Sequence, residues 1–148
     1  MIIFASGRTD IPAFYSEWFL NRVRAGFVDV RNPYVPRKVT RYRLEPKVVD
    51  CIVFCTKNPA PIIPHLEELK DFGIYFFVTI TPYKKDIEPN VPEKSKVIES
   101  FAELSQKIGR DKVCWRYDPV FVDSTYTVAA HIREFKKLCA VLSPYTSR

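Results

Sequence analysis

The hydrophobic positions of this chain form four short continuous runs, which alternate with four longer segments of helical spacing. The runs are rich in β-branched and aromatic residues, as buried parallel strands are; they cover Ile2–Ser6, Cys51–Thr56, Tyr75–Thr81 and Val113–Asp118. A strand followed by a helix, four times over, predicts right-handed β/α units and a parallel sheet. We therefore expect an α/β fold of four consecutive β/α units that form a half-TIM-barrel-like sheet.

The helical segments repeat hydrophobic residues every three or four positions. They cover Ala13–Ala25, Pro61–Phe72, Glu93–Ile108 and Thr127–Leu142. Asp10 or Thr9 can cap the first helix, and a glycine follows each of the first three helices, where glycine ends a helix most readily. These glycines are Gly26, Gly73 and Gly109.

One interval, at about residues 27–45, breaks the alternation and also carries most of the charge. Phe27–Arg31 and Val39–Leu44 are β-like stretches around a Pro-containing loop, so the pattern predicts an inserted β-hairpin. The net charge is +6, and the segment 31–47 supplies +5 of it through Arg31, Arg37, Lys38, Arg41, Arg43 and Lys47 against Glu45. Such a segment attracts phosphate groups and nucleic acid, or it protects an exposed edge strand from aggregation.

Length and composition fit one soluble α/β domain over residues 1–148. The chain is 47% hydrophobic and 27% charged, with 12 Pro and 4 Gly, which excludes a disordered tail, a collagen-like chain and a disulfide-stapled miniprotein. The apolar start, residues 1–5, is too short for a signal peptide, and no window approaches the ~20 apolar residues of a membrane span. We therefore expect a cytoplasmic protein without a membrane partner.

The four cysteines predict buried free thiols rather than a metal site. Cys51 and Cys55 lie on one predicted strand, where four residues at ~3.3 Å each separate them by ~13 Å, too far to share an ion. Cys114 and Cys139 have no nearby Cys or His partner in sequence. No metal ligands and no cofactor are expected within this chain.

Polar residues follow all four predicted strands, and the carboxyl ends of parallel strands share one rim, where ligands bind. Strand one runs into residues 6–10, strand two into 56–58, strand three into Thr79, Thr81 and Tyr83, and strand four into 116–118. Asp118 is our candidate for proton transfer or hydrogen bonding, with Asp10 as a second candidate. The expected ligand-binding residues are Arg8, Thr56, Lys57, Asn58, Thr81 and Arg116.

Each candidate also has a structural interpretation. Asp10 could serve as a helix cap, and Arg8 could form an ion pair with Asp118 across neighbouring strands. Lys57 could cover apolar surface with its aliphatic stem instead of binding a ligand. Asp118 precedes Pro119 and could simply close the strand in a turn. His65 and His131 fall in helical segments and are interpreted as surface or packing residues.

Four longer motifs resemble domain-of-unknown-function family 1848, an uncharacterised bacterial and archaeal family. They cover residues 6–18, 30–33, 48–61 and 115–119, and the segments 81–83 and 86–90 also fit. The resemblance implies that family members are about twice this length. It also implies that their second half resembles the end of a barrel and closes with a Cys-x3-Cys-x2-Cys segment like that of radical S-adenosylmethionine enzymes. Such a trio would hold a [4Fe–4S] cluster that binds S-adenosylmethionine; this segment is not among the 148 residues.

The leading functional hypothesis is therefore the N-terminal half of a radical-S-adenosylmethionine-like barrel enzyme. Its substrate would be an unidentified small or phosphate-containing molecule at the carboxyl ends of the strands. The alternatives are a nucleic-acid- or phosphate-binding module that uses the basic hairpin 31–47, and a truncated chain without independent activity. Four β/α units leave an open sheet edge, so we expect self-association or pairing with a C-terminal half.

Overall fold

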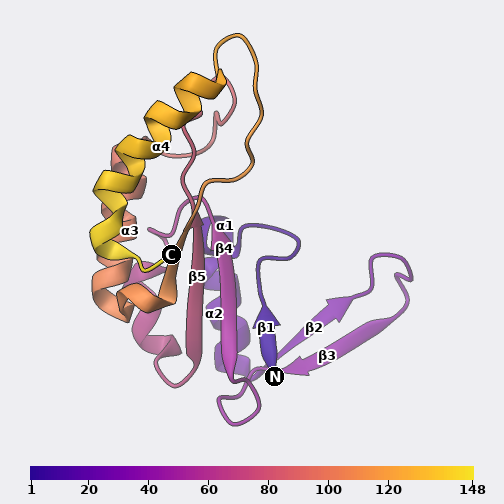
Figure 1. Ribbon diagram of the computed structural model, residues 1–148. Coiled ribbons are helices and arrows are strands. Elements are labelled where there is room, and N and C mark those ends of the chain that lie inside the picture. The colour runs from indigo at the N-terminus through magenta and orange to yellow at the C-terminus, as the bar shows by residue number, and fades with distance from the viewer.

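A computed structural model describes all residues from Met1 to Arg148. Its main element is a parallel sheet of four strands in the order β1 (Ile2–Phe4), β4 (Cys51–Thr56), β5 (Gly73–Thr79) and β6 (Val113–Arg116). Neighbouring strands in the sheet come from consecutive β/α units, which confirms the predicted α/β architecture. The predicted hairpin is also present as a separate antiparallel pair, β2 (Phe27–Arg31) and β3 (Val39–Arg43). It projects from the body of the molecule (Figure 1).

The first predicted helix is divided in two. The structure has α1 (Ile11–Phe14) and α2 (Ser16–Ala25), with Tyr15 between them at φ −135° and ψ 22°. Asp10 caps α1 and Pro12 lies in its first turn, so this short helix has a start of its own. The continuous hydrophobic spacing across Tyr15 concealed the break.

The second predicted helix is a 3₁₀ helix, η1 (Ile63–Leu69). Its buried residues Ile63, Leu66 and Leu69 recur every third position, which matches three residues per turn, and Pro64 removes one backbone donor near its start. The other helices lie close to their predicted bounds, α3 at Lys94–Ile108 and α4 at Val128–Leu142, with Thr127 as the N-cap of α4. Short 3₁₀ turns follow each of them, at Arg110–Lys112 and Ser143–Tyr145.

Two of the three glycines assigned to helix ends have that role, and the third does not. Gly26 and Gly109 adopt positive φ angles of 76° and 95° directly after α2 and α3. Gly73 is instead the first residue of β5, where an added Cβ would lie 2.3 Å from the backbone oxygen of Asp50. Gly73 is therefore required for the close approach of two backbones, not for a helix cap.

All helices pack on one face of the sheet. The single hydrophobic core joins Ile52, Phe54, Phe76 and Val78 to residues of α2, η1, α3 and α4, and Figure 1 shows α2 behind the strands. Residues on the opposite face are half-buried or exposed, apart from Thr79 at 7% exposure. We call this the bare face; its other members are Ile2, Phe4, Cys51, Val53, Cys55, Tyr75, Phe77, Cys114 and Arg116.

The two edges of the sheet differ. β1 forms one edge and pairs only with β4. At the other edge, the backbone N–H of Trp115 donates to the carbonyl of Arg148 at 3.1 Å, and the Thr146 hydroxyl donates to the carbonyl of Val113 at 2.6 Å. The last three residues of the chain therefore lie along β6, where a fifth parallel strand would lie.

Candidate functional site

The rim at the carboxyl end of β6 carries an ion pair on the bare face. Arg116 donates to Asp118 Oδ2 at 2.5 Å and to Cys55 Sγ at 3.5 Å. The two charged side chains are 39% and 60% exposed, so solvent and ligands can reach both. An exposed guanidinium held by a single carboxylate oxygen can exchange that partner for the oxygen atoms of an anionic ligand.

The position of Arg8 corrects one sequence-based interpretation. An ion pair between Arg8 and Asp118 across neighbouring strands is wrong, because β1 and β6 form opposite edges of the sheet and Asp118 pairs with Arg116. Arg8 Nη2 instead donates to the carbonyl of Arg31 at 2.8 Å. Arg8 therefore links the loop after β1 to the hairpin.

A half-buried carboxylate lies at the rim, beside the ends of β4 and β5. Glu88, whose side chain is 13% exposed, pairs with Lys57 Nζ at 2.5 Å and accepts the Thr81 hydroxyl at 3.0 Å. Lys57 follows β4, and Thr81 and Glu88 lie in the loop between β5 and α3. This contact brings together the sequence candidates Lys57 and Thr81 through a residue that was not among the predicted site residues.

The remaining sequence candidates shape the backbone. Asp10 Oδ1 accepts from Ala13 N at 3.0 Å and Oδ2 from Lys57 N at 2.8 Å, so both of its oxygen atoms are engaged by backbone donors. Thr56 Oγ1 accepts from Asn58 N at 2.9 Å, and Asn58 Oδ1 accepts from Ala60 N at 3.3 Å. These contacts stabilise the loops after β1 and β4.

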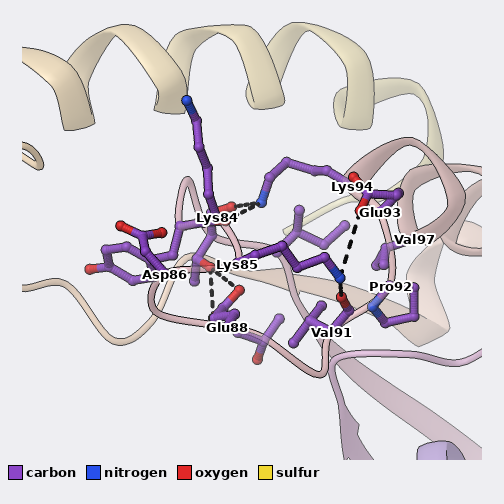
Figure 2. A pocket seen from close by; sticks show the side chains of 13 residues that line it. Lys84, Lys85, Asp86, Glu88, Val91, Pro92, Glu93, Lys94 and Val97 are labelled. Carbon is purple, nitrogen blue, oxygen red and sulfur yellow. Dashed lines mark hydrogen bonds and ion pairs between the residues drawn. The ribbon is translucent and has the colours of Figure 1, made fainter.

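A cavity of about 560 Å³ opens beside Glu88, between the end of β5 and the start of α3. Its lining is mixed in charge, with Lys84, Lys85 and Lys94 facing Asp86, Glu88 and Glu93, and Figure 2 shows these side chains. Lys85 donates a hydrogen bond to the carbonyl of Val91 and forms an ion pair with Glu93. Lys94 is half-buried and donates to the carbonyls of Thr81 and Tyr83.

Tyr83, which lines this cavity, belongs to an aromatic cluster. Tyr83 stacks on Phe121 with ring centroids 4.6 Å apart, and its hydroxyl donates to the carbonyl of Pro119 at 3.0 Å.

His131, 7% exposed, contacts the Tyr117 hydroxyl through Nδ1 at 2.9 Å and the Phe121 carbonyl through Nε2 at 2.8 Å. Because Nε2 faces a carbonyl, it carries the proton and Nδ1 accepts from Tyr117. His131 packs in the interior, and His65 lies at the surface 3.4 Å from Glu68.

Sequence reasoning missed Glu88 and Lys94. Glu88 lies in the loop after the third predicted strand, which has no hydrophobic periodicity, and Lys94 is a polar position at the start of the predicted helix 93–108, so nothing in the local pattern distinguished either from a solvated charge. The one available signal was the segment 86–90, which contains Glu88 and forms part of the family resemblance.

The cysteines do not fit an iron–sulfur cluster. Cys55 and Cys114 share the bare face but flank Phe77 on β5, so at ~4.8 Å per strand their backbones are ~10 Å apart. Cys51 lies four residues further along β4, and Cys139 is exposed on α4. No three His, Cys, Asp or Glu side chains are grouped so that they could hold a metal ion.

Three of the six basic residues in the segment 31–47 pair with two acids, Asp29 and Glu45. Arg41 pairs with Asp29 at 2.7 Å and lies over the Phe27 ring, and Arg43 pairs with Glu45 at 2.7 Å. The Arg43 guanidinium and the Lys47 ammonium hold the pKa of Glu45 at about 2. Arg31, Arg37 and Lys38 form no ion pair, so the unpaired charge lies near the hairpin tip.

Of three comparisons with known proteins, one found a match. A family described as domain of unknown function (DUF1848) matches residues 2–148. No curated protein and no solved structure matches the chain. None of the helices combines the length and the apolar character that a membrane crossing requires.

Proposed function

The chain belongs to the family of the domain of unknown function DUF1848, and from this premise we propose that it forms the substrate-binding N-terminal half of a radical-S-adenosylmethionine-like barrel enzyme. The substrate is a small anionic molecule, phosphate-containing in the simplest case, that binds at the carboxyl ends of the parallel strands. The second half of the barrel supplies the cofactor, because the cysteines of this chain do not fit the cluster.

The bare face of the sheet is the observation that carries this proposal. Parallel sheets are normally covered on both faces, and in a β/α barrel the face without helices lines the interior. Here that face is largely apolar and half-exposed, with Ile2 at 70% and Phe4 at 54% exposure. It ends at Arg116 and Asp118, where the interior of a barrel would open to substrate.

The roles of the rim residues follow from their contacts. An incoming phosphate competes with Asp118 for Arg116, since a guanidinium binds phosphate through parallel N–H donors. Asp118, released from Arg116, is then free to accept a hydrogen bond or a proton from the substrate. Lys57, which is 34% exposed and paired with Glu88, contributes a second positive charge at the end of β4, which is separated from β6 by β5.

Two measurements test the division into substrate and cofactor halves. Anaerobic reconstitution with iron and sulfide is expected to leave these 148 residues without stoichiometric [4Fe–4S] absorbance; a full cluster on this chain refutes the proposal. The coding DNA downstream of Arg148, or a second gene beside it, is expected to encode the Cys-x3-Cys-x2-Cys segment. A genome that encodes no such partner segment also contradicts it.

The hairpin supports a second candidate, a nucleic-acid- or phosphate-binding module. Tyr34 at the tip is 92% exposed, and it lies beside the unpaired Arg37 and Lys38. An exposed aromatic ring next to free cations suits base stacking and phosphate contact.

Salt dependence separates this candidate from the first. Binding of a single-stranded oligonucleotide is expected to weaken steeply with salt and to be lost in Arg37→Gln/Lys38→Gln. Arg41→Gln, which removes a cation already paired with Asp29, is the matched control and is expected to change binding less. Binding that responds to neither salt nor the tip substitutions removes this candidate.

A further inference from the structure

Lys94 is the first residue of α3, and its side chain reaches into the cavity beside Glu88. Two backbone carbonyls, those of Thr81 and Tyr83, accept hydrogen bonds from its Nζ. A neutral amine has two N–H donors, so both acceptors stay satisfied when Lys94 loses a proton. The lone pair then occupies the third position on the nitrogen, for which the chain supplies no acceptor.

The surroundings of Lys94 favour this neutral form. Burial lowers the pKa of Lys94, and the nearby positive charge of Lys57 acts in the same direction. Glu88, Glu93 and Glu134 oppose the shift, but burial has the larger effect. A half-buried amine of this kind has a larger unprotonated, nucleophilic fraction near neutral pH than an exposed lysine has.

The cavity also contains groups for the rest of a ligand. Lys84 extends away from the other side chains (Figure 2), and it is the one lysine of the lining whose ammonium contacts no acceptor within the chain. It can therefore pair with an anionic group. Glu88 lies in the same lining and supplies a carboxylate that can carry a proton.

We propose that Lys94 forms a reversible imine with a phosphorylated aldehyde that binds in this cavity, with Lys84 pairing with the phosphate. The amine nitrogen attacks the carbonyl carbon, and one proton passes from nitrogen to the former carbonyl oxygen to give a carbinolamine. Glu88 carries protons during this transfer. The carbinolamine hydroxyl then takes up a second proton, the C–O bond breaks as water leaves, and the nitrogen lone pair forms the C=N bond; loss of the remaining N–H proton replaces the one consumed and leaves the neutral imine. The step consumes one aldehyde and releases one water, with no oxidant or reductant.

This site can be tested separately from the proposed barrel. Its lining comes entirely from residues 79–97; it includes Thr79 of the bare face and Glu88, the partner of Lys57, but it does not use the ion pair between Arg116 and Asp118. Failure to find a cofactor-bearing partner half would leave the site intact, and failure of imine formation would leave the proposed function intact.

Reductive trapping tests the proposal on the full chain. Pyridoxal 5′-phosphate at limiting concentration with sodium cyanoborohydride, followed by peptide mass spectrometry, is expected to place most of the label on Lys94. Lys96 is the internal comparison, because it is an exposed lysine on the same helix. Pyridoxal, which lacks the phosphate, is expected to label Lys94 several-fold more slowly.

Three variants complete the test. Lys94→Arg keeps the positive charge and is expected to abolish the dominant label, whereas Lys96→Arg is expected to leave it unchanged. Lys84→Gln is expected to remove the preference for the phosphorylated probe. Circular dichroism confirms that each variant is folded, and the wild-type comparison of Lys94 with Lys96 needs no variant. Label distributed among lysines in proportion to exposure, or unchanged in Lys94→Arg, overturns the proposal.

Discussion

Asp10 Oδ2 accepts a hydrogen bond from the backbone N–H of Lys57 at 2.8 Å, across 47 positions in sequence. Its other oxygen atom caps α1 through Ala13 N. One carboxylate therefore fixes the loop after β1 and the loop after β4, and it sets where Lys57 enters the rim. This arrangement indicates that the primary role of Asp10 is positional.

Replacement of Asp10 is expected to destabilise the fold even without any ligand. Asp10→Ala loses the cap and the bond to Lys57, at a combined cost of about 1–3 kcal/mol in the free energy of unfolding. Asp10→Asn keeps one acceptor oxygen for the cap and is expected to lose roughly half as much. Urea unfolding followed by circular dichroism measures both; an unchanged midpoint for Asp10→Ala contradicts the positional role.

Gly73 is expected to tolerate no side chain. An alanine Cβ would lie 2.3 Å from the Asp50 oxygen, so β5 must shift against β4, at an expected cost of about 1–3 kcal/mol of stability. Gly7→Ala is the matched control, since the added Cβ there would make only ordinary contacts with Phe4, at 3.6 Å from Cδ1 and 3.9 Å from the carbonyl oxygen. Chemical denaturation of both variants should separate them clearly; equal stabilities would show that the close approach is not required.

Gly73 also illustrates what the sequence could not specify. A glycine after a hydrophobic helical period is typical of a helix end, yet the decisive contact is with Asp50, which only the paired strands β4 and β5 bring near. The break at Tyr15 is similar, because the hydrophobic period continues across it. The four β/α units, their parallel sheet and the inserted hairpin were predictable, since they follow from the local pattern of hydrophobic residues and from the handedness of β/α connections.

The candidate site was also predictable in part. Arg116 and Asp118 could be placed on the bare face, because alternation along a strand assigns side chains to faces. The pairing of Lys57 with Glu88 could not be predicted, because it depends on the path of the loop between β5 and α3. The sequence of this loop has no hydrophobic periodicity. The suggested pair of Arg8 with Asp118 failed because chain order alone did not show that these residues lie at opposite sheet edges.

The ion pairs of the hairpin predict an acid-dependent change. The pKa of Glu45 lies at about 2 instead of its ordinary 4.5, chiefly because Arg43 donates hydrogen bonds to it. A lowered folded-state pKa contributes stability above the unfolded value, and this contribution is lost as the pH falls from about 4.5 through about 2. Carboxyl NMR titration should find the low midpoint in the wild type and a midpoint nearer 4.5 in Arg43→Gln.

Lys47→Gln is the comparison for that titration. Lys47 lies 3.2 Å from Glu45 and is the lesser cause of the shift, so its removal is expected to raise the pKa of Glu45 less than removal of Arg43 does. An ordinary Glu45 midpoint in the wild type contradicts the assigned ion pairs. It would also return Arg43 to the set of unpaired cations available to a nucleic acid.

The bare face predicts self-association of the isolated chain, unless a C-terminal half covers it. Phe4 lies on this face at the β1 edge and is 54% exposed, so Phe4→Lys places a charge where apolar contact is expected, without disturbing the core. Tyr34→Lys is the matched control, since Tyr34 is 92% exposed in the loop between β2 and β3, and this hairpin projects from the body of the molecule (Figure 1).

Light scattering across a concentration series measures the outcome. The wild type and Tyr34→Lys are expected to show an apparent mass that rises with concentration, whereas Phe4→Lys is expected to stay nearer the monomer mass. The reason is that burial of apolar surface contributes roughly 25 cal/mol for each Å² removed from water, and a lysine ammonium resists that burial. A wild-type monomer at every concentration, with one cooperative melting transition, would show that the bare face needs no cover and would remove the main support for a barrel.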